Sequence, residues 1–242
     1  MKVKAPTREE LEATADRPRP NAAALAAHAR ALYVGGPLLR RKFQHWRPLI
    51  CPFDELLPYV PHDAAVLDVG CGAGLFLGLL ARAGWRPRGI GFDASADAIV
   101  AAGRMGERVG ATGADLRFQH LGVNEPWPAG PFDVVAAIDV MHHIPPAQWR
   151  EVAARLAGHV APGGVLIYKD MCRRPHWRAI ANRLHDLLVA HEWIHYLPVE
   201  QMDRWAAEHG LQQEVARRLN RAWWGHELRV YRRPGDHDAH RN

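Results

Sequence analysis

The sequence predicts an α/β fold built on a seven-stranded, mostly parallel sheet with an antiparallel pair of strands at its C-terminal edge. Three observations lead to this prediction. From residue 65 onward, short apolar runs alternate with amphipathic helical patterns, which is typical of a parallel sheet covered on both faces. A glycine-rich stretch, VLDVGCGAG, follows the first apolar run. The last two strand patterns have only a short connection, which suits antiparallel neighbours.

The parallel part of the sheet contains five expected strands. These are AVLDVG, PRGIGFD, LRFQHL, FDVVAAIDV and GGVLIYKD. The expected helices between them are LFLGLLARAG, ADAIVAAGRMGERVG and PPAQWREVAARLAGHV. A further helix, VEQMDRWAAEHG, precedes the final strands LQQEVARRL and HELRVYRR.

The first 60 residues are expected to be helical and to cover the sheet. Thr7 and Glu10 have capping-box spacing, and Asn21 is placed to cap a helix over AAALAAHARALYV. Pro37 fits the first turn of another short helix, LLRRKFQHW, and Pro48 is expected to break the chain after it. Residues 171–199 interrupt the α/β rhythm with an amphipathic helical insertion, and residues 234–242 form a flexible tail.

Composition and charge narrow the class of protein. The chain has 242 residues, of which 48% are hydrophobic and 24% are charged, as in soluble globular proteins. The net charge of +5 comes from scattered basic residues, which favours solvated arginines over a nucleic-acid surface. Three cysteines without C-x-x-C spacing favour a reducing compartment. With no membrane span and no signal peptide in the pattern, we expect a cytoplasmic protein, and nothing in the sequence sets its oligomeric state.

The glycine-rich stretch carries the strongest chemical signal. Asp68 ends the first strand, and Gly70, Gly72 and Gly74 follow at alternate positions before a helix. Glycines allow a sharp turn and leave room for a ligand against the backbone. An acid two residues before the first glycine disfavours a pyrophosphate and suits a cationic group, such as the amine of an amino acid. Asp93 ends the second strand, where a carboxylate can accept both hydroxyls of a ribose.

These residues resemble the class I S-adenosylmethionine-dependent methyltransferases. The resemblance covers about residues 60–233 and includes four motifs in order: VLDVGCGAG, GIGFDAS, FDVVAAIDVMHHI and VAPGGVLIYKD. It implies a Rossmann-like sheet, S-adenosyl-L-methionine as cofactor and a small-molecule methyl acceptor as partner. It also implies a cofactor-binding methyltransferase domain over residues 61–233, preceded by a helical cap over residues 1–60. Residues 171–199 would then cover the substrate.

The resemblance also implies which residues line the cofactor. The methionine part would lie against Asp68, Gly70, Cys71, Gly72 and Gly74. Asp93 would hold the ribose with Ala94 and Ser95 nearby, and Ile138 and Asp139 would lie near the sulfonium. Many members carry an acid after the third strand, whereas this chain has Leu121 and Gly122. This departure leaves backbone groups or His120 to meet the adenine.

Histidines are the candidate general bases. Methyl transfer from a sulfonium is an in-line displacement, and a hydroxyl acceptor benefits from a base whose pKa lies near neutral pH. His143 follows the fourth strand, and His191 and His195 lie on the insertion. Asp170, at the end of the fifth strand, is expected to point toward the same cleft. Each of these histidines has packing or capping as an alternative role, and His142 is a weaker candidate than His143.

The stretch HEWIH, residues 191–195, also matches the H-E-x-x-H pattern of zinc enzymes, in which both imidazoles lie on one face of a helix. A zinc site needs a third ligand. The chain has Pro198 and Gln201 where the extended pattern needs a glycine and a histidine. We therefore predict no metal site and no zinc hydrolase.

The sequence thus predicts a methyltransferase that methylates oxygen on a small aromatic or polyketide-like acceptor. Aromatic side chains of the cap and insertion are the candidate pocket walls: Tyr33, Phe43, Trp46, Trp177, Trp193 and Tyr196. N-methylation of a small molecule, and methylation of RNA or protein, remain alternatives. The absence of an amino-methylating tetrad, with IDVM in its place, and of any appended binding module argues against nucleic acid. A non-catalytic cofactor-binding scaffold is the alternative of another class.

Overall fold

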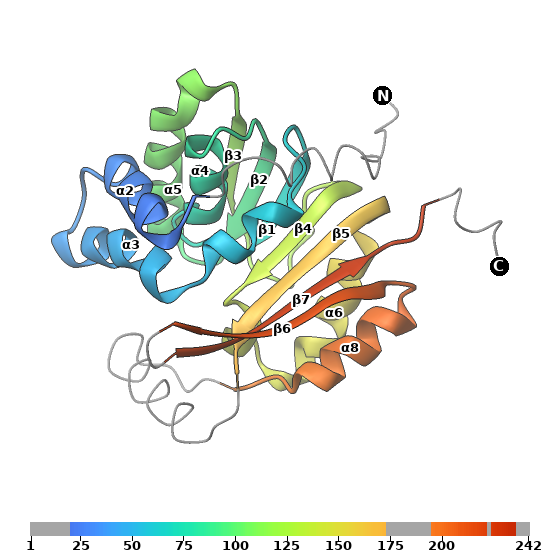
Figure 1. The fold of residues 1–242 in the computed structure, drawn as a ribbon. Coiled ribbons are helices and arrows are strands. Elements are labelled where there is room, and N and C mark those ends of the chain that lie inside the picture. The colour runs from blue at the N-terminus through green and yellow to red at the C-terminus, as the bar shows by residue number, and fades with distance from the viewer. Residues whose placement is uncertain (1–19, 173–194, 222–223, 236–242) are drawn as a thin grey trace.

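The computed structural model describes residues 20–172, 195–221 and 224–235 (Figure 1). Several expectations fall outside these ranges. They concern the helix over residues 7–16, most of the insertion over residues 171–199 with His191, Trp177 and Trp193, and all but the first two residues of the tail over residues 234–242.

The sheet has seven strands within the described chain, in the order β3-β2-β1-β4-β5-β7-β6. Their bounds are β1 Ala65–Val69, β2 Arg88–Asp93, β3 Asp115–His120, β4 Phe132–Ile138, β5 Val160–Met171, β6 Gln212–Arg221 and β7 Trp224–Arg232. The first five strands pair in parallel, and β7 lies antiparallel between β5 and β6. This arrangement confirms the predicted sheet with its antiparallel edge pair.

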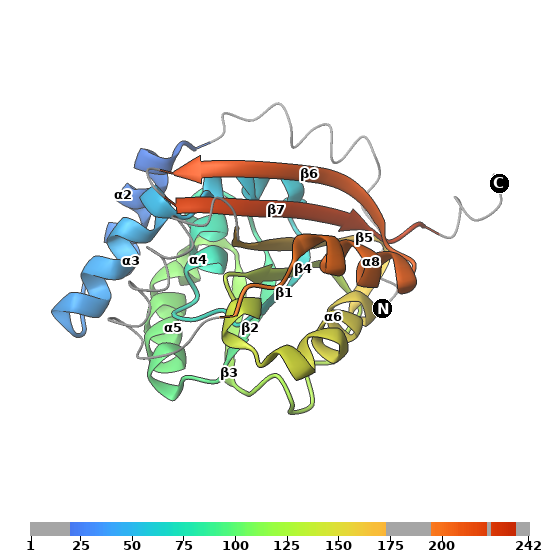
Figure 2. The same cartoon turned by 90° about the horizontal axis from the view of Figure 1, so that it is seen from below.

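Helices cover both faces of this sheet (Figures 1 and 2). Their bounds are α2 Ala22–Leu32, α3 Leu38–Ile50, α4 Leu75–Arg82, α5 Ala96–Val109, α6 Trp149–Gly158 and α8 Val199–Glu208. Short 3-10 helices are η1 Phe53–Glu55, η2 Leu57–Tyr59, η3 Gly110–Thr112, η4 Met141–His143 and η5 Pro146–Gln148. Because strand side chains alternate between faces, Val66 packs with α2, α4 and α5, whereas Leu67 packs with α6 and α8.

The N-terminal helix α2 is part of the main core. Asn21 caps it as predicted, with its side chain accepting a hydrogen bond from the Ala24 backbone N–H at 2.9 Å. Leu25, Ala29 and Leu32 are buried in the same cluster as the apolar face of α4. The described part of the N-terminal region is therefore joined to the sheet domain through one hydrophobic core.

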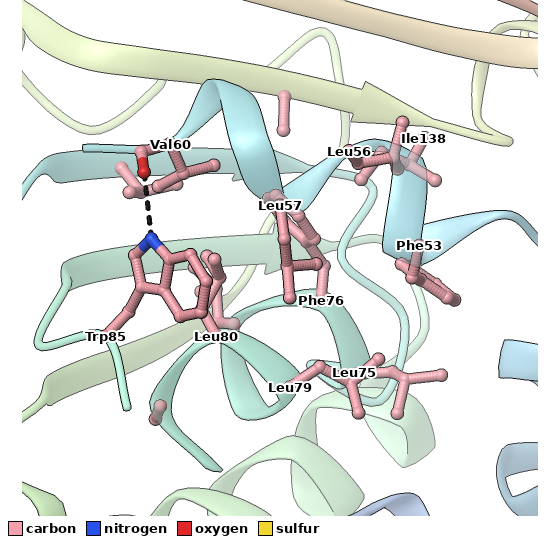
Figure 3. Close-up of a cluster of buried hydrophobic side chains, with 14 of the residues drawn as sticks. Phe53, Leu56, Leu57, Val60, Leu75, Phe76, Leu79, Leu80, Trp85 and Ile138 are labelled. Carbon is pink, nitrogen blue, oxygen red and sulfur yellow. Dashed lines mark hydrogen bonds between the residues drawn. The ribbon is translucent and has the colours of Figure 1, made fainter. Parts of the chain in front are cut away.

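The segment between α3 and β1 packs against the same core. Figure 3 shows Phe53, Leu56 and Leu57 packed against side chains of α4. The indole N–H of Trp85 donates to the Val60 carbonyl at 2.8 Å, which ties the segment to the end of α4 (Figure 3). This packing fixes the position at which β1, and the glycine loop after it, begin.

The predicted break at Pro48 is wrong, because α3 continues through it to Ile50. Pro48 lies in the last turn, where its missing N–H costs a single helical hydrogen bond, and its ring is buried. The chain leaves the helix at Cys51, whose N–H donates to the Arg47 carbonyl at 2.7 Å.

None of the helices in the described parts of the chain is long and apolar enough to cross a membrane.

Candidate active site

A pocket of about 710 Å³ lies at the carboxyl ends of the parallel strands. This is the edge at which open α/β sheets bind their ligands. Polar lining residues are Arg47, Gly70, Gly72, Asp93, Ser95, Asp139, His142, His143 and His226. Apolar lining residues include Phe43, Ile50, Phe92, Leu121, Val123, Val140, Ile144, Pro145, Met171 and Trp224. The pocket thus joins the predicted cofactor loop to the histidines after β4.

The glycine loop lies against this pocket in a conformation that favours glycine. Gly70, Gly72 and Gly74 have φ angles of 66°, 55° and 78°, in the left-handed region. A β-carbon at Gly70 would lie 2.3 Å from the Val140 side chain, so glycine is also required for close packing there. At Gly72, the nearest atom to such a carbon would be Arg47 Nη1, at 3.9 Å, which leaves space beside the loop.

Asp93 holds the loop in place from the end of β2. One carboxylate oxygen accepts from the Gly72 N–H at 2.8 Å, and the other accepts from the Ser95 N–H at 2.8 Å. Each carboxylate oxygen has a second lone pair, so these bonds leave capacity for a ligand hydroxyl. Ala94 and Ser95 are exposed and line the pocket beside it.

Asp68 lies buried beneath the loop, with an exposure of 2%. Its Oδ2 has no hydrogen-bond partner among the described residues. Burial raises the pKa of this carboxyl to about 8, with Arg47 acting in the opposite direction and Asp93 adding to the rise. A buried carboxyl oxygen that accepts no hydrogen bond is energetically unfavourable. A cationic ligand in the pocket would supply the missing donor.

A second acid, Asp139, lies at the end of β4 and, unlike Asp68, is paired with cationic side chains. Lys169 Nζ donates to its Oδ1 at 2.5 Å, and an Arg47 nitrogen lies 3.6 Å from Oδ2. Burial alone would raise the pKa of Asp139, but Lys169 and Arg47 outweigh it and hold that pKa well below its usual range. Asp139 has a φ of 55°, an uncommon conformation outside glycine that this ion pair and the Asp139 N–H bond to the Lys169 carbonyl support.

His142 and Asp170 form a buried pair beside this cluster. His142 Nδ1 hydrogen-bonds to Asp170 Oδ1, and the two residues are only 3% and 4% exposed. The same oxygen accepts from the Met171 N–H at 2.7 Å, which fixes the carboxylate. Asp170 therefore reaches the pocket through His142, which lines it. A carboxylate that accepts from Nδ1 leaves Nε2 as the basic ring nitrogen.

The other predicted bases are placed differently. His143 also lines the pocket but is exposed, with its ring centroid 4.1 Å from that of His142. His195 is exposed and its backbone N–H donates to the His142 carbonyl at 3.2 Å. The expectation that His195 lies on a helical face is wrong, because residues 195–198 are non-helical and α8 begins only at Val199. Pro198 explains this, since the residue before a proline avoids helical geometry.

At the predicted adenine end, Leu121 lines the pocket. The Gly122 N–H donates to Glu125 Oε2 at 2.5 Å. His120 lies beside them and its Nε2 is 2.9 Å from the Ala94 carbonyl, so it donates to the loop after β2.

The remaining predicted residues support the pocket from behind. Cys71 and Ile138 are buried, and Gly74 is the N-cap residue of α4. Of the candidate aromatic walls, Phe43 lines the pocket and Tyr33 is buried, with its hydroxyl donating to the Ala73 carbonyl at 2.7 Å. Trp46 faces solvent instead.

Two basic residues of the pocket were not identified from the sequence. Arg47 comes from α3 and reaches Asp139 across the glycine loop. His226 comes from β7 and is 3% exposed, and neither of its ring nitrogens makes a well-directed hydrogen bond to a described residue. Burial, followed by Lys169, lowers the pKa of His226 to about 3, while Asp139 and the backbone of Ile50 act in the opposite direction. Their positions follow from tertiary packing, and no local motif marks either of them.

Asp139, His142 and Asp170 bring one ligand atom each within 4.8 Å of one another, which is close enough for a metal ion. The surrounding bonds oppose this role. The Lys169 ammonium already neutralises Asp139, and Asp170 accepts from His142. A cation there would have to compete with a buried ammonium group.

Comparison with known proteins places the chain in a family. The model of the methyltransferase domain family matches residues 39–214, and the chain therefore belongs to this family. The family assignment made from the four motifs is confirmed.

The individual relatives match the chain at low sequence identity. A ubiquinone biosynthesis O-methyltransferase of Alkalilimnicola ehrlichii is 32% identical over 151 residues, which are 59% of this chain and 58% of that protein. The chain thus spans less than two thirds of the length of this curated relative. An O-methyltransferase family protein from Burkholderia thailandensis superposes with a TM-score of 0.64 at 20% identity, covering 94% of this chain and 68% of that one.

A second similar structure is a magnesium protoporphyrin IX methyltransferase from Synechocystis PCC 6803 with bound SAH. It superposes with a TM-score of 0.62 at 18% identity, covering 86% of this chain and 93% of that chain. Both structural similarities concern the fold.

Proposed function

We propose that this chain is an S-adenosylmethionine-dependent methyltransferase that methylates oxygen on a small-molecule acceptor. One observation carries the proposal. A single pocket contains the glycine loop over Asp68, whose buried oxygen has no donor among the described residues, and the His142–Asp170 pair. The first is suited to an amino-acid ammonium, and the second to removal of a proton.

The pocket residues fit the cofactor group by group. Asp68 accepts the ammonium of the methionine part, Arg47 provides a cation for its carboxylate, and Asp93 accepts from the ribose hydroxyls. The open space beside Gly72 admits a ligand against the backbone. When bound, S-adenosylmethionine supplies an electrophilic methyl group on sulfur.

His142 is the general base in this proposal, in place of His143. It would take the proton of the acceptor hydroxyl at Nε2 while that oxygen receives the methyl group, whose bond to sulfur breaks to leave S-adenosylhomocysteine. Asp170 orients the ring through Nδ1 and stabilises the imidazolium that results. His226, buried and neutral, offers its ring nitrogens to a polar group of the acceptor and so positions it.

The acceptor class follows from the walls of the pocket. Apolar side chains from several elements line it, among them Phe43, Ile144, Met171 and Trp224. Such walls suit an aromatic or polyketide-like compound with a few polar groups. The relative named for ubiquinone biosynthesis supports O-methylation, whereas the structural neighbour named for magnesium protoporphyrin IX shows that the fold also serves other acceptors.

Calorimetry with S-adenosylmethionine and with S-adenosylhomocysteine tests the cofactor. We expect binding of both, and we expect Asp93→Ala to weaken it at least tenfold. Asp97→Ala, an exposed acid four residues on, is the matched control and should leave the affinity unchanged. Because Asp93 also holds Gly72, Asp93→Asn and a melting curve for each variant separate lost ribose contacts from a collapsed loop. Unchanged affinity in Asp93→Ala would contradict the assignment.

Methyl transfer to a panel of phenols, catechols, amines, RNA and protein identifies the acceptor class. Turnover of phenolic hydroxyls supports the proposal, and turnover of amines alone would replace O-methylation by N-methylation. Binding of RNA with a steep salt dependence would favour a nucleic-acid substrate. Tight cofactor binding without turnover on any of these would indicate a non-catalytic scaffold.

A further inference from the structure

The helix α3 presents its apolar side to solvent, although it is amphipathic. Leu39 is 83% exposed, Trp46 is 65% exposed and Leu38 is 53% exposed. Val34, just before the helix, and Phe43 and Leu49 within it are also more than 40% exposed. These six residues form what we call the α3 apolar face, and Figures 1 and 2 show α3 on the outside of the molecule. Soluble proteins rarely expose such contiguous apolar groups without a function.

This orientation is fixed by contacts at the edges of the apolar arc and on the opposite side of the helix. At about 100° per residue, the five exposed apolar side chains of α3 fall within an arc of about 140°. His45 and Arg47 fall just outside the two edges of this arc: His45 Nε2 is 2.8 Å from the Tyr33 carbonyl, and Arg47 reaches Asp139. The buried ring of Pro48 lies on the opposite side of the helix, toward the protein. The helix cannot turn its apolar face inward without breaking these contacts.

The charge of α3 indicates which kind of surface the α3 apolar face contacts. The helix carries Arg40, Arg41, Lys42 and Arg47 and has no acidic residue. In the helical projection Lys42 falls within the apolar arc, and Arg40 and Arg41 flank it on either side. An exposed apolar stripe with tryptophan, bordered by basic side chains, has the pattern of a helix that lies in the interface of an anionic membrane.

We propose that α3 docks this protein on the surface of an anionic lipid bilayer, with the α3 apolar face inserted among the acyl chains. Arg40, Arg41 and Lys42 then contact the lipid headgroups, whereas Arg47 stays beside Asp139 in the pocket. A second copy of the chain is a poorer occupant, because pairing through α3 would bring together surfaces that are positively charged on both sides. The inference rests on the exposure and charge of α3 and does not depend on the proposed function.

The same helix forms a wall of the pocket, which gives the docking a geometric consequence. Phe43, Arg47 and Ile50 line the pocket, and Phe43 belongs to the α3 apolar face as well. A bilayer under α3 would therefore lie next to the pocket wall, from which an apolar acceptor dissolved in the membrane can enter.

Vesicle sedimentation tests the proposal with the full chain. We expect binding to vesicles that contain phosphatidylglycerol, and weaker binding to pure phosphatidylcholine or in high salt. The double variant Leu39→Glu/Trp46→Glu should weaken partitioning at least tenfold. Its control is Val100→Glu, a side chain that is 54% exposed on another helix, α5. Lys42→Glu should weaken binding about fivefold or more, whereas Arg108→Glu on α5 should not.

A fluorescent label locates the insertion. The three native cysteines are buried, so Leu39→Cys offers a selective site for an environment-sensitive dye. We expect a blue shift with anionic vesicles at position 39 and none in Val100→Cys. Melting curves and cofactor calorimetry show that each variant is folded.

Three results would overturn the proposal: absence of vesicle binding, equal binding by Leu39→Glu/Trp46→Glu and Val100→Glu, or a dimer in sedimentation velocity that the double variant disrupts. The last result would identify a second copy as the occupant. Failure of vesicle binding with intact cofactor binding would leave the methyltransferase proposal standing, which keeps the two tests separate.

Discussion

Two aspartates, Asp68 below the glycine loop and Asp139 at the end of β4, have pKa values shifted in opposite directions, although burial alone would raise both. Asp68 has an oxygen without a donor among the described residues, and burial raises its pKa to about 8. Asp139 is held in its charged form because Lys169 and Arg47 overcome the cost of burial. The charge of Asp139 is thus already neutralised, whereas Asp68 can still pair with a positively charged ligand.

Cofactor binding should therefore release a proton. In the free protein Asp68 is mostly protonated at pH 7, because its pKa is about 8. An ammonium group beside it favours the carboxylate and lowers that pKa, so affinity should rise as the pH increases toward 8. At pH 7, titration calorimetry should show more exothermic binding in Tris than in phosphate, since Tris takes up protons with more heat. Asp68→Asn should remove this difference, and equal heats for the unmodified protein would refute the linkage.

The His142–Asp170 pair predicts unequal roles for neighbouring histidines. His142→Ala should lower kcat by roughly 10²–10⁴-fold on the acceptor identified by the panel, because a general base is lost. Its cofactor affinity should stay within about twofold. Asp170→Asn should lower kcat less and change the pH profile of kcat. The His142 ring keeps its position in this variant but loses the negative charge of its partner. His143→Ala is the matched control, and a larger loss of kcat there than in His142→Ala would reverse the assignment.

The choice between these histidines shows the limit of local reasoning. The motif VMHHI places both after β4, and spacing alone favoured neither strongly. The proposal for His142 rests on β5, which pairs with β4 so that Ile138 lies beside Lys169 and Asp170 reaches the loop after β4. The pairing of these strands, and with it the pair His142–Asp170, depends on how the whole sheet assembles.

At the scale of elements, α2 and α3 differ in how they contribute to stability. Leu25 of α2 is fully buried, whereas Leu39 of α3 is 83% exposed. Leu25→Ala should lower the free energy of unfolding by about 2–5 kcal/mol, because a buried cavity forms. Leu39→Ala should change it by less than about 0.5 kcal/mol. Urea unfolding measures both, and a small effect of Leu25→Ala would show that α2 is detachable from the core.

Strand and helix positions were predictable because their signals are local. The buried strands and the cap at Asn21 follow from runs of apolar residues and one side-chain oxygen. The continuation of α3 through Pro48 was not predicted. A proline in the last turn removes only one helical hydrogen bond, so the helix can include it. The outward apolar face of α3 was also missed, since a helical pattern gives the faces of a helix but not which one meets the protein.

At the scale of the molecule, the pocket unites residues that are far apart in the chain. Arg47 precedes the glycine loop and His226 lies on β7, yet both line the pocket with Asp139. They meet because β7 pairs with β5, whose other neighbour is β4, and because α3 ends beside the loop after β1. The cofactor loop could be identified from its own sequence, whereas the acceptor side depends on these long-range contacts.

Metal analysis of the whole protein tests both candidate metal sites together. One is the H-E-x-x-H pattern, in which His195 lies outside any helix. The other is the cluster of Asp139, His142 and Asp170, where Lys169 Nζ lies 2.5 Å from Asp139 Oδ1. A divalent ion there would have to displace this buried ammonium, so we expect far less than one zinc per chain and no change in cofactor affinity or melting temperature after EDTA treatment. One tightly bound ion per chain, whose removal lowers the melting temperature, would show that the ion pair yields to a metal and would require a different role for His142.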